Sequence, residues 1–301
     1  MDILTIKNLK KRFGEKEVLR GLDLTVPEHS IYGFVGRNGA GKTTAMKTIL
    51  GLLRADDGEI FVAGEKVTVG QTATNRYIGY LPDVPEFYPF MTAREYLRLC
   101  GESLGMNGTD IKKRSDELLE RVGLADETHR IRGFSRGMKQ RLGIAQALLG
   151  SPKLLICDEP SSALDLIGRR DILDILVSVK DQTTVLFSTH ILSDVERVCT
   201  DVALLNDGKI ALQGKIDCLK QAKREEIFTV EVLESRHAEA LATAFTNATY
   251  YNYTKDTLVF SGGEDDFLDV LRFIAENKIS VRKAERMEPS LESLFMEVVA
   301  K

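Results

Sequence analysis

The 301-residue sequence contains no tryptophan, four cysteines and no long apolar run. The cysteines are scattered without a C-x-x-C pair, which favours isolated thiols in a reducing cytosol over disulfides or a zinc site. A membrane-spanning helix would need about 18 consecutive apolar residues, and residues 1–7 lack the apolar core of a signal peptide. The sequence therefore predicts a cytosolic protein whose association with a membrane would depend on a partner.

The sequence also lacks a strong charge of either sign. It has 41 lysine and arginine residues and 45 aspartate and glutamate residues, which gives a formal net charge of −4. Proteins that bind DNA or RNA usually carry an excess of basic residues that contact the phosphates. We therefore expect no nucleic-acid partner. The length is sufficient for one large and one small folded unit.

Residues 36–44 are the most informative segment of the chain. They read G-R-N-G-A-G-K-T-T and fit the phosphate-binding pattern G-x-x-x-x-G-K-[ST]. Residues 30–35 have the apolar character of a buried strand, and residues 44–50 have that of a helix. A loop between a strand and a helix N-terminus directs several backbone N–H groups toward one point, where the helix dipole favours an anion. A chance match in a glycine-rich turn is the alternative, and the flanking strand and helix argue against it.

This loop predicts a site for a nucleoside triphosphate. Lys42 would reach the β- and γ-phosphates, and the Thr43 hydroxyl would ligate Mg²⁺. The residues expected at the phosphates are Gly36, Asn38, Gly39, Ala40, Gly41, Lys42, Thr43 and Thr44.

Two acidic residues follow a second buried strand. Residues 154–159 read L-L-I-C-D-E, so that Asp158 stands at the carboxyl end of an apolar run, where ligands bind in open α/β sheets. Asp158 would hold Mg²⁺ beside Thr43. Glu159 could polarise the attacking water as a general base. Two solvated acids at a strand end are the alternative, which the phosphate loop in the same chain disfavours.

The hydrophobic pattern divides the chain into four regions. Residues 1–35 alternate like an antiparallel β subdomain, and residues 86–150 have the periodicity of a helical subdomain. Strands and helices alternate over residues 151–214, which predicts a parallel sheet flanked by helices. From residue 215 to 301 the order βαββαβ, followed by a last helix, predicts a small α+β ferredoxin-like domain. The fold class is therefore α/β, with domains at 1–214 and 215–301.

Residues 134–141 read F-S-R-G-M-K-Q-R and resemble, in a variant form, the signature motif L-S-G-G-Q of the ABC-transporter ATPases. In that family the motif of one subunit completes the ATP site of the other. The resemblance implies that Ser135 and Gly137 contact the γ-phosphate in trans, at a helix N-terminus that favours an anion. Ser135 is also a good N-cap for a helix over residues 139–149, which is a purely structural alternative.

Further motifs extend the resemblance over residues 1–214. Residues 162–165 resemble the D-loop, which implies that Asp165 belongs to the nucleotide site. His190 resembles the switch histidine that contacts the γ-phosphate, although a lone histidine is more often structural. Phe13 stands where the family has an aromatic residue that stacks on adenine, and ordinary core packing is its alternative.

Three positions depart from the family's commonest pattern. Asp83, in the segment Y-L-P-D, stands in place of the Q-loop glutamine, and a carboxylate can ligate Mg²⁺ but cannot donate a hydrogen bond. Arg136 replaces the first glycine of the signature and Met138 replaces its glutamine. Arg136 could contact a phosphate or the facing subunit, or it could point to solvent. The resemblance thus implies ATP and Mg²⁺ as ligands, catalytic roles for Lys42, Glu159 and His190, and metal ligation by Thr43, Asp83 and Asp158.

These departures resemble the ATPases of bacterial ABC-2 type drug and antibiotic exporters, as does the ending E-P-S-L-E-S-L-F at residues 288–295. The resemblance implies that two copies of the chain bind two ATP molecules head to tail. They would drive an integral membrane permease on a separate chain, at the inner face of the cell membrane. The permease would dock on the helical region, where the cluster at residues 88–91, Y-P-F-M, is either a partner contact or core.

A soluble ABC-type ATPase that acts on ribosomes or DNA is the main alternative function. Ribosome-directed members resemble two cassettes joined by a charged linker, and DNA-repair members insert a long coiled coil. This sequence contains one cassette and no sustained heptads between Lys42 and Ser135. A P-loop kinase is a third class, and the signature motif argues against it.

Overall fold

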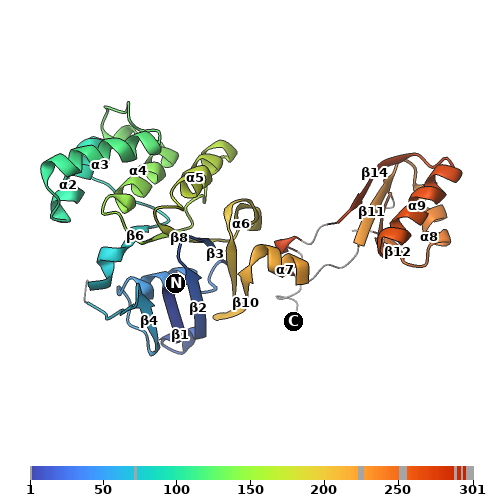
Figure 1. Cartoon of the computed structure of the whole chain (residues 1–301), viewed down its shortest axis with the longest axis horizontal. Coiled ribbons are helices and arrows are strands. Elements are labelled where there is room, and N and C mark those ends of the chain that lie inside the picture. The colour runs from blue at the N-terminus through green and yellow to red at the C-terminus, as the bar shows by residue number, and fades with distance from the viewer. Residues whose placement is uncertain are drawn as a thin grey trace. The chain divides into compact units, whose positions relative to one another are not determined.

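A computed structural model describes residues 2–70, 73–222, 227–250, 256–287, 290–292, 294 and 295, and the chain divides into two compact units (Figure 1). The first unit spans Met1–Ile216 and includes Phe295, and the second spans Asp217–Leu294. Each unit has its own sheet structure and its own hydrophobic core, as expected of a domain.

A six-stranded, mainly parallel sheet forms the centre of the first unit, with the strand order β10-β9-β3-β8-β7-β6. The bounds of its strands are β3 Ile31–Gly36, β6 Ile78–Leu81, β7 Leu154–Asp158, β8 Thr184–Thr189, β9 Asp201–Asn206 and β10 Lys209–Lys215. Neighbouring strands are parallel except in the β9–β10 hairpin. The central strands β3, β8 and β7 are buried along their whole length, which explains their continuous apolar runs. Because these strands are parallel, their carboxyl ends lie along one edge, where α/β sheets bind ligands.

A four-stranded antiparallel sheet in the order β2-β1-β4-β5 forms the other layer of this unit. Its strands are β1 Asp2–Phe13, β2 Lys16–Pro27, β4 Asp57–Val62 and β5 Glu65–Lys66. The inward residues of this sheet share one core with the parallel sheet and with helix α1 (Lys42–Ile49). Ile6, Phe34 and Met46 lie in that core and are almost fully buried. The prediction of an antiparallel subdomain is therefore confirmed.

Helices dominate residues 86–150, as the sequence predicts. The bounds of the helices in the first part of the chain and of the two short 3₁₀ helices are α2 Ala93–Ser103, α3 Gly108–Arg121, α4 Arg136–Leu148, α5 Leu166–Ser178, α6 Leu192–Val198, α7 Ile216–Ala222, η1 Ala73–Tyr77 and η2 Ile131–Gly133. Helix α4 begins at Arg136, earlier than the predicted residue 139. The cause is Ser135, whose Oγ accepts a hydrogen bond from the Met138 N–H at 3.2 Å and caps the helix.

The second unit has the element order strand, helix, strand, strand, helix, strand. The bounds are β11 Ile227–Val232, α8 Ser235–Ala244, β12 Ala248–Tyr250, β13 Thr257–Ser261, α9 Glu264–Glu276 and β14 Val281–Arg286. The strands form one antiparallel sheet in the order β12-β13-β11-β14. Phe228 and Phe260 stack in its core with ring centres 4.9 Å apart. The motif at 288–295 and the predicted last helix lie partly outside the described residues.

Within the described part of the chain, no helix combines the length and the apolar character that crossing a membrane requires.

Candidate functional site

The predicted phosphate loop joins strand β3 to helix α1. Gly41 precedes the helix with a φ of 111°, a left-handed conformation that glycine adopts without strain. No side chain caps α1, and its first turn contains no acidic residue. A side chain at Gly36 would also place its Cβ 2.6 Å from the Leu205 carbonyl oxygen. The first N–H groups of α1 therefore face outward from the helix end without a competing carboxylate, as an anion site requires.

Lys42 is buried at the start of α1 and turns back toward the loop. Its side chain is 6% exposed, and its Nζ donates to the Gly36 carbonyl oxygen at 2.7 Å. The same Nζ lies 3.1 Å from Oε1 of Glu159 at the end of β7. This ion pair joins the phosphate loop to the predicted general base in a single subunit.

The Glu159 carboxylate lies between two partners. Among the described residues Oε1 has no hydrogen-bond partner and pairs with Lys42 by charge, whereas Oε2 lies 3.0 Å from Nδ1 of His190. The backbone of Glu159 has a φ of 48°, which is uncommon for a residue other than glycine and costs energy unless neighbours hold it. The predicted acid, histidine and lysine are thus brought together, although they come from two strand ends and the start of a helix.

Asp158 is oriented by a serine on the neighbouring strand. Asp158 pairs with Ser188 in the register of β7 and β8, and its Oδ1 accepts a hydrogen bond from the Ser188 Oγ at 2.6 Å. That hydroxyl oxygen in turn accepts from the Glu159 N–H at 3.0 Å. Ser188 therefore fixes the side chain of one acid and the backbone of the other.

Tyr80 lies on β6, the strand next to β7. Burial, and second the negative charge of Asp158, raise the pKa of Tyr80 to about 12. Its hydroxyl therefore stays protonated at neutral pH and adds no further negative charge beside Asp158.

The residues predicted to hold Mg²⁺ supply oxygen ligands, the type that this ion prefers. Thr43 is exposed in the first turn of α1, directly after Lys42, and Asp158 is 3% exposed at the strand end. The described residues contain no group of three or more histidine, cysteine, aspartate or glutamate side chains that could enclose a metal. This donor set fits an ion that keeps several water molecules, as Mg²⁺ usually does.

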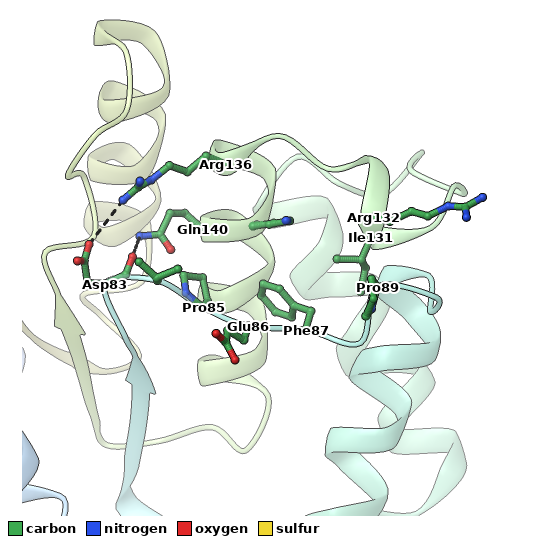
Figure 2. Close-up of a pocket in the computed structure, with 11 residues that line it drawn as sticks. Asp83, Pro85, Glu86, Phe87, Pro89, Ile131, Arg132, Arg136 and Gln140 are labelled. Atoms are coloured by element: carbon green, nitrogen blue, oxygen red, sulfur yellow. Dashed lines mark hydrogen bonds and ion pairs between the residues drawn. The ribbon is translucent and has the colours of Figure 1, made fainter.

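Asp83, the third predicted metal ligand, contacts the loop after β7 and the start of α4, and Figure 2 shows its contact with Arg136. Its Oδ1 accepts a hydrogen bond from the Ser162 Oγ at 2.7 Å and lies 3.7 Å from the Arg136 guanidinium. Arg136 thus faces a carboxylate of its own subunit, an arrangement that the sequence did not predict. Two of the three departures from the family pattern, Asp83 and Arg136, therefore contact each other.

The residues predicted to act across a dimer serve as helix caps in the single subunit. Ser135 caps α4, and the Asp165 side chain accepts from the Gly168 N–H at 3.0 Å and caps α5. Both residues are exposed, and Gly137 is half-buried. In the described part of the chain, none of the three makes a hydrogen bond or an ion pair with Lys42 or Glu159. Ser135 therefore serves as a helix N-cap in the single chain, as its structural alternative predicts. This cap does not exclude a contact with ATP bound to a second subunit.

Phe13 ends strand β1 and is 50% exposed, so the core alternative is wrong for this residue. The Lys11 Nζ lies 5.4 Å from the centre of its ring. An exposed ring of this kind is available for stacking on a base.

A pocket of about 420 Å³ lies between the loop that begins at Asp83 and the start of α4 (Figure 2). Its apolar lining comes mainly from Pro85, Phe87 and Ile131, and its charged lining includes Arg136. Nearby Tyr88 and Phe90 are 52% and 59% exposed, with ring centres 5.8 Å apart. The aromatic cluster at residues 88–91 therefore presents two rings at the surface, which the core alternative does not explain.

Sequence reasoning missed three polar residues that organise this region. Gln140 lies in the signature segment, Ser162 lies in the segment that resembles the D-loop, and Ser188 stands two residues before His190; the sequence predicts no role for them. The available signal is polarity in a buried setting, because Ser188 follows the apolar residues V-L-F of a strand and is fully buried.

Comparison with known proteins shows what this chain is similar to. The family model described as ABC transporter matches residues 19–162. The chain is 37% identical to YxlF of Bacillus subtilis (strain 168), an uncharacterized ABC transporter ATP-binding protein, over 99% of each chain. It is 36% identical to the bacitracin transport ATP-binding protein BcrA of Bacillus licheniformis, over 99% of this chain and 97% of that protein.

Two shorter proteins match only the larger part of the chain. The lantibiotic transport ATP-binding protein SrtF of Streptococcus pyogenes is 36% identical over 77% of this chain and 98% of its own length. A solved dimeric, post-hydrolysis state of the ATP-binding cassette MJ0796, bound to ADP and Pi, is 26% identical with a TM-score of 0.64. It covers 71% of this chain and 98% of that chain. Both leave unmatched a length of this chain comparable to the second unit.

Proposed function

Because this chain belongs to the family of ABC transporter ATP-binding proteins, we propose that it powers the export of a drug, antibiotic or peptide through a separate membrane permease. As a member of this family it binds ATP, and its hydrolysis of ATP drives transport. The likeness to the bacitracin transport protein BcrA over nearly the whole of both chains supports a drug, antibiotic or peptide as the cargo. The expected location is the inner face of the cell membrane, through contact with the permease.

The position of Glu159 is the observation that carries the proposed mechanism. Its carboxylate is paired with Lys42 on one oxygen and with His190 on the other, at 3.1 and 3.0 Å. When the phosphates of ATP engage Lys42, the competing charge lowers the attraction between Lys42 and Glu159. The released oxygen then accepts the proton of the attacking water, and His190 keeps the carboxylate oriented.

Mg²⁺ belongs to the same proposal. When bound, it neutralises the charge that develops on the β- and γ-phosphates. Thr43 would hold it through the hydroxyl, and Asp158 would hold it directly or through water, in the orientation that Ser188 imposes. Asp83 would contribute through Oδ2, since its Oδ1 contacts Ser162 and Arg136.

A second copy of the chain would complete the nucleotide site. Ser135 and Gly137 stand at the N-terminus of α4, where backbone N–H groups favour an anion, whereas Asp165 caps α5 with its own carboxylate. The exposure of Ser135 and Asp165 in the single subunit supports a role across a head-to-tail dimer. A related ATP-binding cassette has been solved as a dimer with ADP and Pi. Phe13 would stack on adenine.

The permease would dock on the helical region at the pocket between Asp83 and α4. The pocket has an apolar lining, and the exposed rings of Tyr88 and Phe90 lie beside it in the sequence. Exposed aromatic side chains next to a pocket are typical of protein interfaces.

The second unit has the element order and the strand order that suit a ferredoxin-like domain. This unit would not be needed for ATP hydrolysis, because the match to SrtF covers 98% of SrtF but only 77% of this chain.

A capture experiment tests the proposed function. Tagged Glu159→Gln protein, extracted with mild detergent and Mg·ATP from its own host, should bring down a polytopic membrane protein in near-equal amount. Lys42→Ala protein, treated in the same way, is the control for nucleotide dependence. Recovery of ribosomal proteins, or of a dimer without a membrane protein, would instead support a soluble ABC-type ATPase.

A further inference from the structure

Gln140 is a fully buried polar side chain in the second turn of α4. Its Nε2 donates to the carbonyl oxygen of Asp83 at 3.1 Å and to that of Pro160 at 3.2 Å. Figure 2 shows the bond to Asp83 at the wall of the pocket. A single side-chain amide therefore joins the backbones of two loops that follow different strands, β6 and β7.

The chemistry of the partners fixes the orientation of this amide. Both partners are carbonyl oxygens, which only accept hydrogen bonds, so the NH₂ end of Gln140 must face them. The two N–H groups are both used, whereas Oε1 has no hydrogen-bond partner among the described residues. The side chain is thus specialised for donation to these two loops.

One of the two loops carries the general base. Pro160 directly follows Glu159, whose φ of 48° must be held by its surroundings. Ser188 accepts from the Glu159 N–H, the Ser162 N–H donates to the Glu159 carbonyl oxygen at 3.0 Å, and Gln140 binds the next carbonyl oxygen. Ser188 lies in the sheet and Ser162 lies in the loop after β7, whereas Gln140 belongs to helix α4.

The other loop forms a wall of the pocket. Asp83 and Gln140 both line it, and the Asp83 carboxylate adds a second link to the loop of Glu159 through Ser162. A displacement of the Asp83 backbone therefore pulls on the same amide that holds the Pro160 backbone. Packed interiors transmit small shifts of this kind because they contain few voids.

We propose that Gln140 is a positioning residue for ATP hydrolysis, through which a protein segment seated in the pocket at Asp83 acts on the backbone that carries Glu159. The inference rests on the proposed function, because it takes Glu159 as the base and the pocket as the permease site. Gln140 contacts neither ATP nor water in this account. It acts through the Pro160 carbonyl oxygen alone.

The first test separates turnover from binding. Gln140→Met keeps the volume and removes both donors, and it also removes the unpaired acceptor, so the fold is expected to survive. Gln140→Leu also removes both donors and introduces no charge. Each variant should lower kcat about tenfold or more, because the base is no longer held, and leave the KM for ATP within about twofold.

Lys113→Met is the control, since Lys113 is exposed on helix α3, lies outside the pocket at Asp83, and its side chain makes no hydrogen bond or ion pair in the described part of the chain. It should keep kcat. A purely structural role for Gln140 would instead lower the midpoint of thermal unfolding and raise KM together with the fall in kcat. An unchanged kcat in Gln140→Met would overturn the proposal.

The second test places bulk in the pocket without a permease. Val84 lines the pocket and is 64% exposed, so Val84→Cys can be modified with biotin maleimide. The exposed Cys218 is changed to serine in every variant, and protein without Val84→Cys is treated identically as the control. The label should change kcat several-fold when Gln140 is present and should have no effect in Gln140→Met.

A label that alters kcat equally in both proteins, or in neither, would overturn the link through Gln140. The two proposals fail in different ways. If the unmodified protein showed no more ATPase activity than Lys42→Ala, the proposed function itself would be at fault. Normal activity with an effect of the label that does not depend on Gln140 would contradict only the further inference.

Discussion

Two sets of site residues differ in what they touch within one subunit. Lys42, Asp158 and Glu159 lie at the ends of buried parallel strands or at the adjoining helix start, and contacts of 2.6 to 3.1 Å connect them to their neighbours. Ser135 and Asp165 are exposed, and in the single chain they only cap helices. The proposed catalytic residues are therefore connected within one chain, whereas Ser135 and Asp165 are accessible to a second copy, which fits the proposed shared site.

The physical origin of the difference is the position of each set in the fold. Strand ends are fixed by the ladder of a sheet, so residues such as Asp158 and Ser188 meet whenever β7 and β8 pair. Helix N-termini leave unpaired N–H groups that a second molecule can use. We therefore expect that replacing Lys42, Asp158 or Glu159 has a large effect on ATP binding or hydrolysis. The effect of replacing Ser135 or Asp165 should depend on dimer formation.

Replacement of Glu159 should give the largest effect. Glu159→Gln removes the proton acceptor and should lower kcat by about 10²- to 10⁴-fold. It also removes the negative charge beside Lys42, so the affinity for Mg·ATP should stay the same or rise. Steady-state ATPase assays and equilibrium binding of ATP measure the two quantities. Glu86→Gln, at an exposed acid of the pocket, is the control; equal losses in both variants would contradict the role of Glu159.

Replacement of Lys42 should reduce binding. Lys42→Ala removes a charge-assisted contact to phosphate, which is worth about 1.5–3 kcal/mol, or roughly 10- to 150-fold in Kd. Lys47→Ala, at an exposed position of the same helix, should leave the Kd unchanged. Isothermal titration with a non-hydrolysable ATP analogue makes the measurement. Unchanged affinity in Lys42→Ala would overturn the assignment of the phosphate loop.

Replacement of Ser135 should affect the dimer and spare the subunit. Asparagine caps helices as well as serine does, so Ser135→Asn should change the free energy of unfolding by less than about 0.5 kcal/mol. Binding of ATP to the monomer should also be unchanged, but ATP-dependent dimerisation and turnover should weaken several-fold. Thermal unfolding, ATP binding and ATPase assays separate these quantities. Equal turnover in Ser135→Asn and wild type would remove Ser135 from the composite site.

Removal of the second unit should have the smallest effect on nucleotide binding. A chain truncated after Gly214 keeps every residue of both sets, so its Kd for Mg·ATP should stay within about twofold of the full chain. The same truncation of Lys42→Ala protein is the control. Loss of ATP binding on truncation would show that the boundary between the units is misplaced or that the second unit supports the site.

Sequence patterns predicted much of the fold, because buried parallel strands and capped helices have local signals. The run L-L-I-C before Asp158 forms the buried strand β7, as its apolar character predicts. The predicted start of α4 is three residues late, because the cap at Ser135 makes Arg136 the first helical residue. The motif at 288–295 lies partly outside the described residues.

The contacts between motifs could not be predicted from the sequence. The pairing of Asp83 with Arg136 joins positions 53 residues apart, and the two bonds of Gln140 depend on where α4 crosses two loops. The φ of Glu159 also has no sequence signal, since the residue is not a glycine. Such features arise from tertiary packing, which local propensity does not encode.

The most direct test of the central claim is the molar mass of Glu159→Gln protein, measured by size-exclusion chromatography with light scattering. At saturating Mg·ATP the protein should have the mass of two chains. Without nucleotide, or when Ser135→Asn is added, the population should shift toward the mass of one. A single-chain mass at saturating Mg·ATP would contradict a nucleotide site divided between two copies.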